Sequence, residues 1–384
     1  MHALTRPLSP GATIGIMGGG QLGRMAAIAA ARLGFRVHIF TPEPDSPAAQ
    51  VSAGATVADW SDKDALERFA GAVDVVTVEF ENVPGEALER MAARVPVAPS
   101  PAVLRICQDR IAEKTFLEGA GVAVGAWAPV ASPGQAEAAV AKVGLPCVLK
   151  TTRLGYDGKG QATLRSPDAL GPALARLAGA DGGFRPLIAE AFVDFACEIS
   201  VVVARDRDGR IAAYDTVENR HRNHILDLTI APARVPATVA EAAQAAARRV
   251  AEAIGLVGLL CVEFFVTRSG RVLANEIAPR PHNSGHWTIE ACAVSQFEQQ
   301  IRAVAGLPLG DPSRHSDALM KNLIGDEIEA LPALLATPGL IPHHYGKAEA
   351  RPGRKMGHVT RLFPRGGLPD DDVIAQAFAP LETG

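Results

Sequence analysis

Apolar runs alternate with helix-like segments over the N-terminal part of the chain. The strand-like runs cover residues 12–18, 35–40 and 74–80, and the helix-like segments cover residues 21–34 and 62–69. Single apolar strands separated by helices are typical of a parallel sheet with crossover connections. We therefore expect residues 1–107 to form a doubly wound, Rossmann-like α/β domain, whose last strand is followed by the turn-rich run VPVAPSP at residues 95–101.

A different pattern begins after this turn. One helix-like stretch over residues 102–118 leads to two strands, GLPCVLKTT and GQATLR, which flank the loop RLGYDGKG at residues 153–160. The loop is short, charged and rich in glycine, which favours a hairpin connection. A further helix is expected over residues 167–177.

Longer strands dominate the next part of the chain. They are expected at residues 186–193, 197–206, 209–218, 258–267 and 271–279, with a helix at residues 239–255. Strands of this length joined by Arg-Asp-Gly and Arg-Ser-Gly turns are typical of an antiparallel sheet. Residues 108–310 are thus expected to form an α+β domain, and residues 311–384, with two or three short strands, a small β-rich C-terminal domain.

The composition is that of a globular protein. Of the 384 residues, 48% are hydrophobic and 21% are charged, and the formal net charge is −4. The lack of a basic excess argues against nucleic acid or a membrane surface as a partner. No apolar run is long enough for a membrane span, and the N-terminal segment lacks the apolar core of a signal peptide. We expect a cytoplasmic protein whose five scattered cysteines are reduced thiols.

The sequence GIMGGGQLGRM contains Gly18-x-Gly20-x-x-Gly23 directly after an apolar run. Glycines at this spacing allow a strand to turn tightly into a helix, whose first N–H groups can bind an anion. Glu43 and Asp45 follow the second apolar run, where a dinucleotide-binding domain carries its ribose-binding acid. By itself this stretch allows an NAD or FAD enzyme.

Lys150 ends the strand before the glycine-rich loop, which itself carries Arg153, Asp157 and Lys159. Flexible backbone next to charged side chains suits a lid that folds over a polyphosphate. The alternative is a solvated hairpin loop without a ligand.

Glu263 and Glu276 lie on two strands joined by a turn near Gly270, so a hairpin brings them nearly opposite each other. Two carboxylates this close repel unless a cation lies between them. Mg²⁺ is the natural cation, because it accepts a few carboxylate oxygens and leaves its other positions to water and a nucleotide. The alternative is a pair of edge carboxylates facing water, although both lie in otherwise apolar runs.

The segment Arg280-Pro-His-Asn-Ser-Gly-His286 follows the second of these strands. His282 and His286 have a spacing that can bind zinc on one face of a helix, but the intervening stretch is a poor helix and no third ligand is evident. We expect Arg280, Asn283 and His286 to face a small oxyanion instead.

The order of these features resembles the ATP-grasp superfamily, whose members clamp ATP between two α+β lobes and join a carboxylate to a nucleophile through an acyl phosphate. Four motifs are similar to those of the N5-carboxyaminoimidazole ribonucleotide synthetases of purine biosynthesis: GQLGRM (20–25), GYDGKGQ (155–161), NEIAPRPHNSGHWT (275–288) and RPGRKMGH (351–358). The resemblance covers nearly the whole chain. It implies a pre-ATP-grasp domain at residues 1–107, a two-lobed ATP-grasp domain at residues 108–310, with lobes of about 120–190 and about 191–310, and the small C-terminal domain.

The resemblance also assigns residues to ATP and to a metal. ATP would be bound by Arg110, Lys150, Gly155, Tyr156, Asp157, Gly158, Lys159, Gly160, Gln161, Glu190, Ala191, Phe192, Val193, Glu198, His221, Asn275 and Glu276. Lys150 would contact the phosphates and Glu198 the ribose hydroxyls. Glu263 and Glu276 would hold Mg²⁺, the one cofactor implied.

The second substrate that the resemblance implies is 5-aminoimidazole ribonucleotide. Its site would be formed by Gly20, Gln21, Leu22, Glu79, Glu81, Tyr156, Lys159, Arg354 and Lys355. In this interpretation the glycine fingerprint binds no dinucleotide, and the helix N-terminus after Gly20 faces the phosphate of the ribonucleotide.

The reaction implied is the ATP-dependent carboxylation of this ribonucleotide. Bicarbonate attacks the γ-phosphate of ATP, carboxyphosphate forms, and the exocyclic amine captures its carboxyl carbon, with ADP and phosphate as the other products. The catalytic residues would be Asp157, Lys355, Arg280, Asn283 and His286, with Asp157 orienting or deprotonating the amine. The glycine-rich loop would close to keep water from the labile intermediate. The family further implies a homodimer and a separate mutase that takes up the product.

Two alternatives remain open from the sequence. Another ATP-grasp carboxylase or ligase, such as a formate-using ribonucleotide transformylase, a biotin carboxylase or a dipeptide ligase, would share the ATP residues and differ in GQLGRM and GRKMGH. An NAD(P)-dependent oxidoreductase would use the loop from Gly18 to Gly23 for pyrophosphate, which leaves Glu263, Asn275 and Glu276 without a role.

Overall fold

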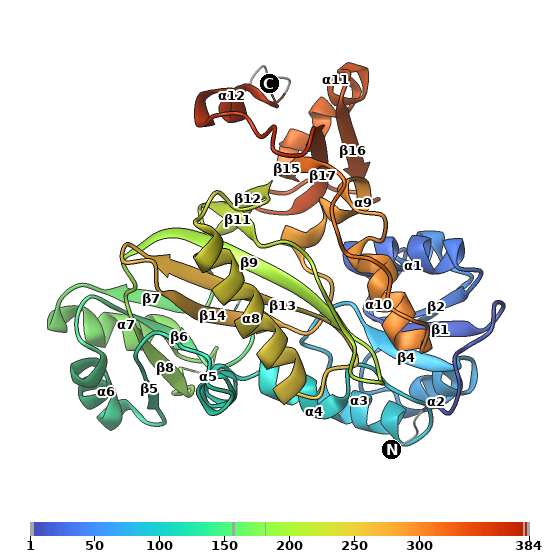
Figure 1. Cartoon of the computed structure of the whole chain (residues 1–384). Coiled ribbons are helices and arrows are strands. Elements are labelled where there is room, and N and C mark those ends of the chain that lie inside the picture. The colour runs from blue at the N-terminus through green and yellow to red at the C-terminus, as the bar shows by residue number, and fades with distance from the viewer. Residues whose placement is uncertain (1–3, 156–157, 181, 379–380, 382–384) are drawn as a thin grey trace.

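Three β-sheets organise the computed structural model, which describes residues 4–155, 158–180, 182–378 and 381 (Figure 1). One four-stranded sheet lies in the N-terminal part, a second lies in the middle of the chain, and a nine-stranded sheet extends through the rest of the described residues. The predicted combination of an α/β domain, an α+β region and a β-rich C-terminal part is confirmed.

The N-terminal sheet is parallel, with the strand order β3-β2-β1-β4. Its elements are β1 (Thr13–Met17), α1 (Gln21–Arg32), β2 (Arg36–Thr41), β3 (Gly54–Val57), α2 (Lys63–Gly71), β4 (Val75–Val78) and α3 (Gly85–Ala92). Ile14 and Ile16 pack with α1, whereas Met17 and Phe40 pack with α2 and α3, so helices cover both faces. The sequence pattern predicted every strand except β3, which is short and alternates between partly buried and exposed positions.

The stretch after this domain forms two helices, so the prediction of one helix over residues 102–118 is wrong. The first, α4 (Pro101–Cys107), ends before Gln108, and the second, α5 (Arg110–Gly119), begins after Asp109. The Asp109 carboxylate accepts hydrogen bonds from two N–H groups in the first turn of α5, which starts a new helix there.

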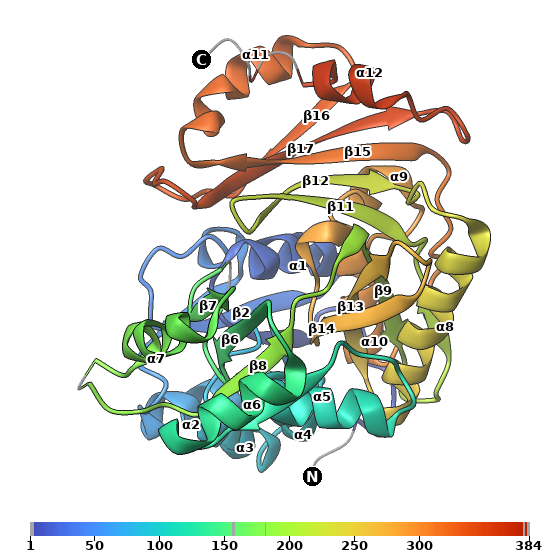
Figure 2. The same ribbon diagram turned by 90° about the vertical axis from the view of Figure 1, so that its left-hand side faces the viewer.

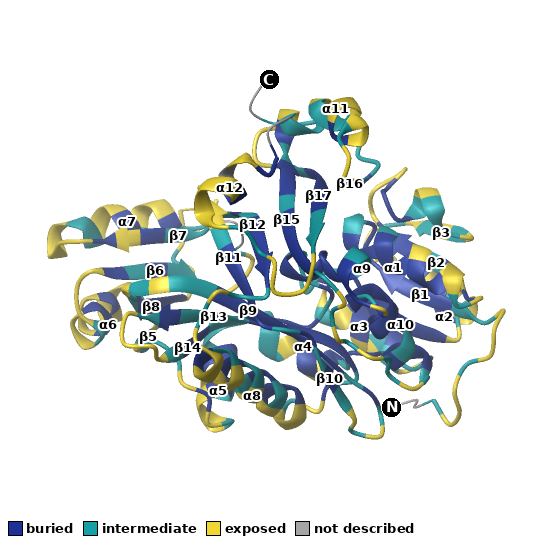
Figure 3. Ribbon diagram, turned by 45° about the horizontal axis from the view of Figure 1, so that its top comes forward, coloured by how far each residue is buried: buried dark blue, intermediate teal, exposed yellow. Residues whose placement is uncertain are grey.

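The middle sheet is antiparallel, with the order β5-β8-β6-β7. Its elements are β5 (Trp127–Val130), α6 (Ala136–Val143), β6 (Cys147–Thr151), β7 (Gln161–Leu164), α7 (Leu170–Leu177) and β8 (Leu187–Ala191). Lys150 pairs with Gln161 across β6 and β7, so the glycine-rich loop is a hairpin connection, as predicted. Cys147 and Leu149 pack with α6 and α7, and the outer faces of these helices are exposed (Figure 3). Because side chains alternate along a strand, Lys150 points to the face that these helices leave uncovered.

The nine-stranded sheet has the order β14-β13-β9-β11-β12-β15-β17-β16, with β10 pairing β9. Its first part comprises β9 (Phe195–Arg205), β10 (Ile211–Ala213), β11 (Val217–Arg222), β12 (Ile225–Ala231), β13 (Gly258–Thr267) and β14 (Val272–Ala278), with α8 (Ala237–Ala253) packed on one face. The predicted single strand over residues 209–218 is wrong, because the chain leaves the sheet at Tyr214. This buried side chain donates a 2.8 Å hydrogen bond from its hydroxyl to the Val294 carbonyl.

The C-terminal strands continue the same sheet. They are β15 (Asp317–Ile324), β16 (Leu340–His344) and β17 (Lys355–Phe363), accompanied by the short helices α11 (Leu331–Ala336) and α12 (Asp371–Gln376). β15 pairs with β12, where Met320 lies opposite Thr229. Figure 2 shows these strands continuing the layer of β11 and β12 across the top of the molecule. Main-chain hydrogen bonds therefore join the C-terminal part to the preceding domain.

Two helices return the chain to the N-terminal domain before β15 begins. α9 (Thr288–Ala291) is a single turn, and α10 (Gln296–Ala305) packs against α1. Phe297, Ile301 and Val304 of α10 belong to the same hydrophobic core as Ile14 and Ile16 of β1. This shared core fixes the N-terminal sheet relative to the large sheet.

Within the described ranges, no helix is both long and apolar enough to cross a membrane. All five cysteines are free thiols, as their spacing predicted.

Candidate active site

Lys150 of β6 and Glu190 of β8 form an ion pair on the sheet face opposite α6 and α7. The Lys150 Nζ lies 2.8 Å from Glu190 Oε2, and both side chains are largely buried. Burial disfavours the charge of Glu190, but the cations of Lys150 and Lys114 outweigh it and hold the pKa of the carboxyl at about 2. Glu190 Oε1 is buried without a hydrogen-bond partner among the described residues. The pair therefore offers a fixed ammonium group and an open acceptor oxygen.

Arg110, at the start of α5, connects the glycine-rich loop with the large sheet. Its Nη1 lies 3.3 Å from Glu276 Oε2 in β14, and its Nη2 donates a 3.0 Å hydrogen bond to the Gly155 carbonyl. The guanidinium presents its donors in a rigid fork, so Arg110 fixes the start of the loop relative to β14.

Glu263 and Glu276 lie directly opposite each other on β13 and β14, as the hairpin predicted. Each carboxylate has a cation beside it: Arg110 contacts Glu276, and His282 Nε2 lies 2.9 Å from Glu263 Oε1. Burial disfavours the charge of Glu263, yet His282 and His221 bring the pKa of its carboxyl to about 2. Paired carboxylates are oxygen donors of the type that Mg²⁺ accepts, so these residues fit the implied metal.

Glu198 and His221 form a second pair on the large sheet. His221 Nδ1 lies 2.8 Å from Glu198 Oε2, and each side chain is about one fifth exposed, at 23% and 22%. Burial disfavours the charged imidazole, but the hydrogen bond to Glu198 raises the pKa of His221 above its usual value. The partly exposed carboxylate can accept hydrogen bonds from hydroxyl groups of a ligand.

The Glu79 side chain occupies the turn formed by the glycine fingerprint. The Gly23 N–H donates to Glu79 Oε2 at 3.4 Å, and burial raises the pKa of this carboxyl. A Cβ on Gly18 would lie 2.4 Å from Glu79 Cγ, and one on Gly20 would lie 2.8 Å from Glu79 Oε2. These glycines are thus required by the close approach of Glu79.

A carboxyl group at the N-terminus of α1 changes what that end can bind. A dinucleotide pyrophosphate would meet the Glu79 side chain there, so the NAD or FAD interpretation finds no support. The expectation that the same helix end faces the phosphate of a ribonucleotide is corrected for the same reason. A group that donates hydrogen bonds, such as a hydroxyl, suits Glu79 better.

Arg280, just after β14, forms an ion pair with Glu81, which follows β4. The Arg280 side chain is 17% exposed and the Glu81 side chain 24%. Burial disfavours the charge of Glu81, but Arg280 brings the pKa of this carboxyl to about 2. The pair joins the N-terminal domain to the end of the hairpin formed by β13 and β14.

The two histidines of the motif that follows Arg280 lie in different environments. His282 contacts Glu263; its burial opposes the charge, but Cys261 and Glu263 raise its pKa well above the usual value. His286 is fully buried, Gln296 Nε2 donates to its Nδ1, and burial lowers its pKa well below the usual value. Both amide atoms of Asn283 are buried without a partner among the described residues. The sequence predicted His282 only as a possible zinc ligand. Its role as the cation that pairs with Glu263 was not predicted.

The two motif histidines do not converge on a zinc site. In the described part of the chain, Glu290, His343 and His358 form a group with metal-ligating atoms close together. The rings of His343 and His358 stack at 4.5 Å and 9°, and His343 Nε2 lies 2.7 Å from Glu290 Oε1. Stacked rings do not direct their in-plane lone pairs at one point, so this group is a packed polar cluster.

Basic residues gather in the C-terminal part, and Lys347 among them lies near Glu79. Lys347 Nζ donates to the Lys355 carbonyl at 2.6 Å, and Arg354 Nη1 donates to the Glu349 carbonyl at 2.8 Å. Burial and the nearby Arg354 lower the pKa of Lys347 to about 8, while Glu79 acts in the opposite direction. Arg354 and Lys355 were predicted from the sequence, but Lys347 was not. The feature that could have indicated Lys347 is the high density of basic residues between 347 and 355.

The remaining predicted residues lie around these groups. Gly20, Gln21 and Leu22 lie at the start of α1, and Gly155, Gly158, Lys159, Gly160 and Gln161 belong to the loop and the start of β7. Ala191 ends β8, Phe192 and Val193 follow it, and Asn275 precedes Glu276 in β14. Phe192 is 48% exposed, which is high for an aromatic side chain. Tyr156 and Asp157 lie outside the described residues.

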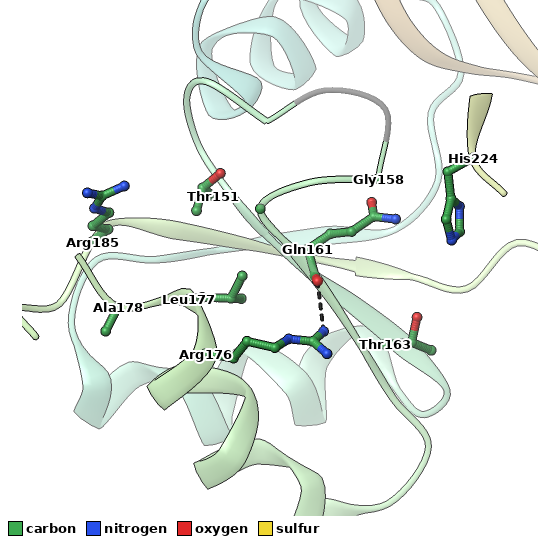
Figure 4. A pocket seen from close by; sticks show the side chains of 10 residues that line it. Thr151, Gly158, Gln161, Thr163, Arg176, Leu177, Ala178, Arg185 and His224 are labelled. Carbon is green, nitrogen blue, oxygen red and sulfur yellow. Dashed lines mark hydrogen bonds between the residues drawn. The ribbon is translucent and has the colours of Figure 1, made fainter. Parts of the chain in front are cut away.

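A cavity of about 520 Å³ lies beside the glycine-rich loop (Figure 4). Its polar lining includes Gln161, Arg176 and His224, and Arg176 donates a 2.8 Å hydrogen bond to the Gln161 carbonyl. His224, in the turn between β11 and β12, is so close to Gly158 that a Cβ there would lie 2.9 Å from its own Cβ. None of the charged pairs described above lines this cavity.

Models of three known domains match the chain in this order. The ribonucleotide synthetase preATP-grasp domain matches residues 11–108, the ATP-grasp domain matches residues 115–297, and the phosphoribosylaminoimidazole carboxylase C-terminal domain matches residues 318–365. The fold and the charged site between its sheets therefore define an ATP-grasp ligase.

Similar proteins narrow the class to one family. The chain is 51% identical to an N5-carboxyaminoimidazole ribonucleotide synthase of Brucella melitensis, over 93% of this chain and 98% of that protein. It is 42% identical to the synthase of the same name from Bacillus subtilis, over 96% and 94% of the two chains. The chain belongs to the N5-carboxyaminoimidazole ribonucleotide synthase family.

Solved structures of this family share the whole fold. A crystal structure of an N5-carboxyaminoimidazole ribonucleotide synthetase with ADP has a TM-score of 0.92 at 40% identity, covering 99% of this chain and 98% of that one. A synthase from Aspergillus clavatus, in complex with ADP and 5-aminoimidazole ribonucleotide, has a TM-score of 0.89 at 32% identity, covering 98% and 100%.

Proposed function

We propose that the chain carboxylates 5-aminoimidazole ribonucleotide with bicarbonate and ATP, giving N5-carboxyaminoimidazole ribonucleotide, ADP and phosphate in purine biosynthesis. The observation that carries the proposal is the pairing of Glu263 with Glu276, linked through Arg110 to the glycine-rich loop. The names of the relatives and the ADP and ribonucleotide complex of a similar synthase support the choice of substrate.

ATP binds in this proposal between the small lobe and the large sheet. Lys150 contacts the phosphates, and Glu198, oriented by His221, accepts hydrogen bonds from the ribose hydroxyls. Phe192 and its neighbours at the end of β8 offer an exposed aromatic surface for the adenine base. The glycine-rich loop, including Tyr156 and Asp157, closes over the phosphates and excludes water.

Glu263 and Glu276 hold Mg²⁺ in this proposal. When bound, the metal offsets charge on the transferring phosphoryl group. Arg110 and His282, which lie beside the two carboxylates, hold them in position. Asn275, next to Glu276, adds a neutral oxygen donor on the same strand.

The ribonucleotide lies between the N-terminal domain and the C-terminal strands. Glu79 follows β4, and its side chain, which occupies the turn before α1, accepts hydrogen bonds from the hydroxyl groups of the ribonucleotide. Gly20, Gln21 and Leu22 form the adjoining wall. Lys347, Arg354 and Lys355 supply the positive charge for its phosphate. Glu81 and Lys159 complete the surroundings of this substrate.

Bicarbonate lies beside Arg280 and Asn283, and we assign its third contact to His282 in place of the buried His286. A bicarbonate oxygen attacks the γ-phosphorus, and the bond to ADP breaks. The exocyclic amine nitrogen then attacks the carboxyl carbon of carboxyphosphate, phosphate leaves, and Asp157 takes the amine proton. We assign Lys355, whose charge acts on Glu263, to holding the leaving phosphate.

The assembly of the chain as a homodimer, its place in the cytoplasm and the transfer of the labile product to a separate mutase remain predictions of the resemblance. Each follows from what the family implies.

The decisive experiment is to measure ADP release from ATP, Mg²⁺ and bicarbonate with and without 5-aminoimidazole ribonucleotide. We expect strong stimulation by this ribonucleotide and a loss on the order of 100-fold in Glu276→Ala, because a bound metal contributes several kcal/mol to phosphoryl transfer. Glu137→Ala, on the exposed face of α6, is the matched control and keeps full activity. Stimulation by formate with another ribonucleotide, or by biotin, instead of 5-aminoimidazole ribonucleotide would assign a different substrate.

A further inference from the structure

β14 is irregular at the residues proposed to hold the metal. Glu263 pairs with Glu276, but the next residue of β13, Phe264, pairs with Ala274, so Asn275 is an extra residue in β14. Such a β-bulge re-aims side chains and leaves backbone groups without partners in the ladder. Asn275 and Glu276 are both partly exposed, between the buried Ala274 and Ile277, so the bulge turns two consecutive side chains to the open side.

Side chains from α5 satisfy the backbone on both sides of Glu276. Lys114 Nζ donates to the Asn275 carbonyl at 2.6 Å, and the Ile277 N–H donates to Glu113 Oε1 at 2.5 Å. Both side chains are almost completely buried, with 3% of each residue exposed. Buried backbone groups that lack partners are costly, so these two contacts favour the bulged form of the strand.

The same face of α5 also contacts the Glu276 side chain. Arg110, Glu113 and Lys114 have the spacing i, i+3 and i+4, which places them together on one side of a helix. They contact the Glu276 carboxylate, the Ile277 N–H and the Asn275 carbonyl, respectively. Three neighbouring side chains of one rigid element thus contact three consecutive residues of the strand.

We propose that Glu113 and Lys114 are positioning residues of the metal site, which hold the bulge of β14 so that Asn275 and Glu276 face the metal and nucleotide together. This inference rests on the proposed function, in which Glu276 binds Mg²⁺. Neither residue touches a substrate; each acts through the backbone of β14. Loss of either contact lets β14 return to a regular register, which turns Asn275 or Glu276 away from the site.

The test measures ATP binding by calorimetry, once with Mg²⁺ and once with a chelator, in the full-length wild type and in Lys114→Met and Glu113→Leu. Changing outer contacts of a metal ligand lowers metal affinity by about 10- to 100-fold, so we expect Mg²⁺-ATP binding to weaken by about tenfold or more. Metal-free ATP binding stays within about twofold in Glu113→Leu, because Lys150, Glu190 and Glu198 are untouched. Lys114→Met also removes one of the cations that act on Glu190, so Glu113→Leu is the cleaner of the two variants. Glu113→Gln, which keeps an oxygen acceptor for the Ile277 N–H, retains the Mg²⁺-dependent part of the affinity.

Arg205→Met is the matched control. Arg205 Nη1 donates to the Leu256 carbonyl at 2.8 Å, which is the same type of contact at the far end of β9. This variant loses some thermal stability and keeps the Mg²⁺ dependence of wild type. If Lys114→Met does not fold, the comparison of Glu113→Leu with Glu113→Gln decides alone.

The outcomes separate this inference from the proposed function. Metal-dependent binding that is unchanged in folded Lys114→Met and Glu113→Leu overturns the positioning role alone. An equal loss with and without metal also overturns it, because these residues would then act on the nucleotide site as a whole. A wild type whose ATP binding does not depend on Mg²⁺ overturns the metal assignment and this inference together.

Discussion

The charged residues of the site occur as opposite-charge pairs, and each pair joins two different elements. Lys150 and Glu190 link β6 to β8, Arg110 and Glu276 link α5 to β14, and His282 holds Glu263 of β13. In the pairs Lys150–Glu190 and His282–Glu263, removal of one member would leave a largely buried, unpaired charge, which is strongly destabilising. The pairs therefore preorganise the site before a ligand arrives.

Lys347 gives a prediction for the pH dependence of catalysis at the residue scale. Its pKa of about 8 arises from burial and from Arg354 and Lys355, opposed by Glu79 and Glu43. As the pH rises through about 8, Lys347 loses the charge proposed to bind the substrate phosphate, so kcat/KM for the ribonucleotide falls by up to about tenfold per pH unit. Steady-state kinetics between neutral pH and pH about 9.5 measure this alkaline decrease of kcat/KM.

Lys347→Arg is the comparison for this profile. Arginine stays charged over the whole range, so its kcat/KM remains level where that of wild type falls. If kcat/KM of Lys347→Arg decreases with pH as that of wild type does, the titrating group is a different residue.

At the scale of elements, the hairpin of β6 and β7 is shaped by glycines that admit no side chain. Gly160 has φ +70°, and a Cβ there would lie 2.6 Å from Thr151 Oγ1. The position therefore needs glycine both for its backbone conformation and for the close approach of Thr151. Arg110 holds the first end of the same loop through the Gly155 carbonyl, so both described ends of the loop are fixed.

Gly160→Ala is predicted to lower kcat/KM for ATP by about tenfold or more, because a 1–2 kcal/mol penalty of the left-handed conformation and a steric clash both displace the loop. Gly339→Ala is the control: its φ is +83° and no atom lies within 4 Å of the added Cβ. Both variants lose stability in thermal unfolding, but only Gly160→Ala loses ATP turnover. Equal turnover in the two variants would contradict a role of the loop in closing the site.

At the scale of the whole molecule, the large sheet makes one cooperative unit of two regions that the sequence separates. Leu319 of β15 is fully buried and lies opposite Ile230 of β12 on one side and Arg361 of β17 on the other. The hydrophobic cluster around Leu319 includes residues of both regions. Since main-chain pairing and side-chain packing both cross the boundary, we expect the two regions to unfold together.

Leu319→Ala tests this coupling. A buried leucine-to-alanine change lowers the free energy of unfolding by about 2–5 kcal/mol. We expect hydrogen exchange to accelerate in β12 as well as in β15 and β17. Leu335→Ala, at a 65% exposed position of α11 in the same C-terminal region, leaves exchange unchanged. Faster exchange confined to residues after 310 would show that the C-terminal region opens by itself.

The pattern of apolar positions was sufficient for most strands, because a strand that is buried on one or both faces must carry its hydrophobic residues at a fixed period. The pairing of Glu263 with Glu276 also followed from the sequence, since a short turn at Gly270 fixes the register of a hairpin. Element boundaries that depend on a single side chain were predicted less well. Asp109 divides one predicted helix into two, and Tyr214 divides one predicted strand.

The sequence by itself determined the class of the fold, the order of its parts, the hairpin with its two carboxylates and the four motifs of the family. Only the tertiary structure decided that Glu79 fills the glycine turn, that His282 and not His286 faces Glu263, and that Glu113 and Lys114 hold the strand of Glu276. Each of these depends on contacts between residues far apart in the chain. Periodicity and turn chemistry act over a few residues, whereas such contacts form only when the sheets and α5 pack together.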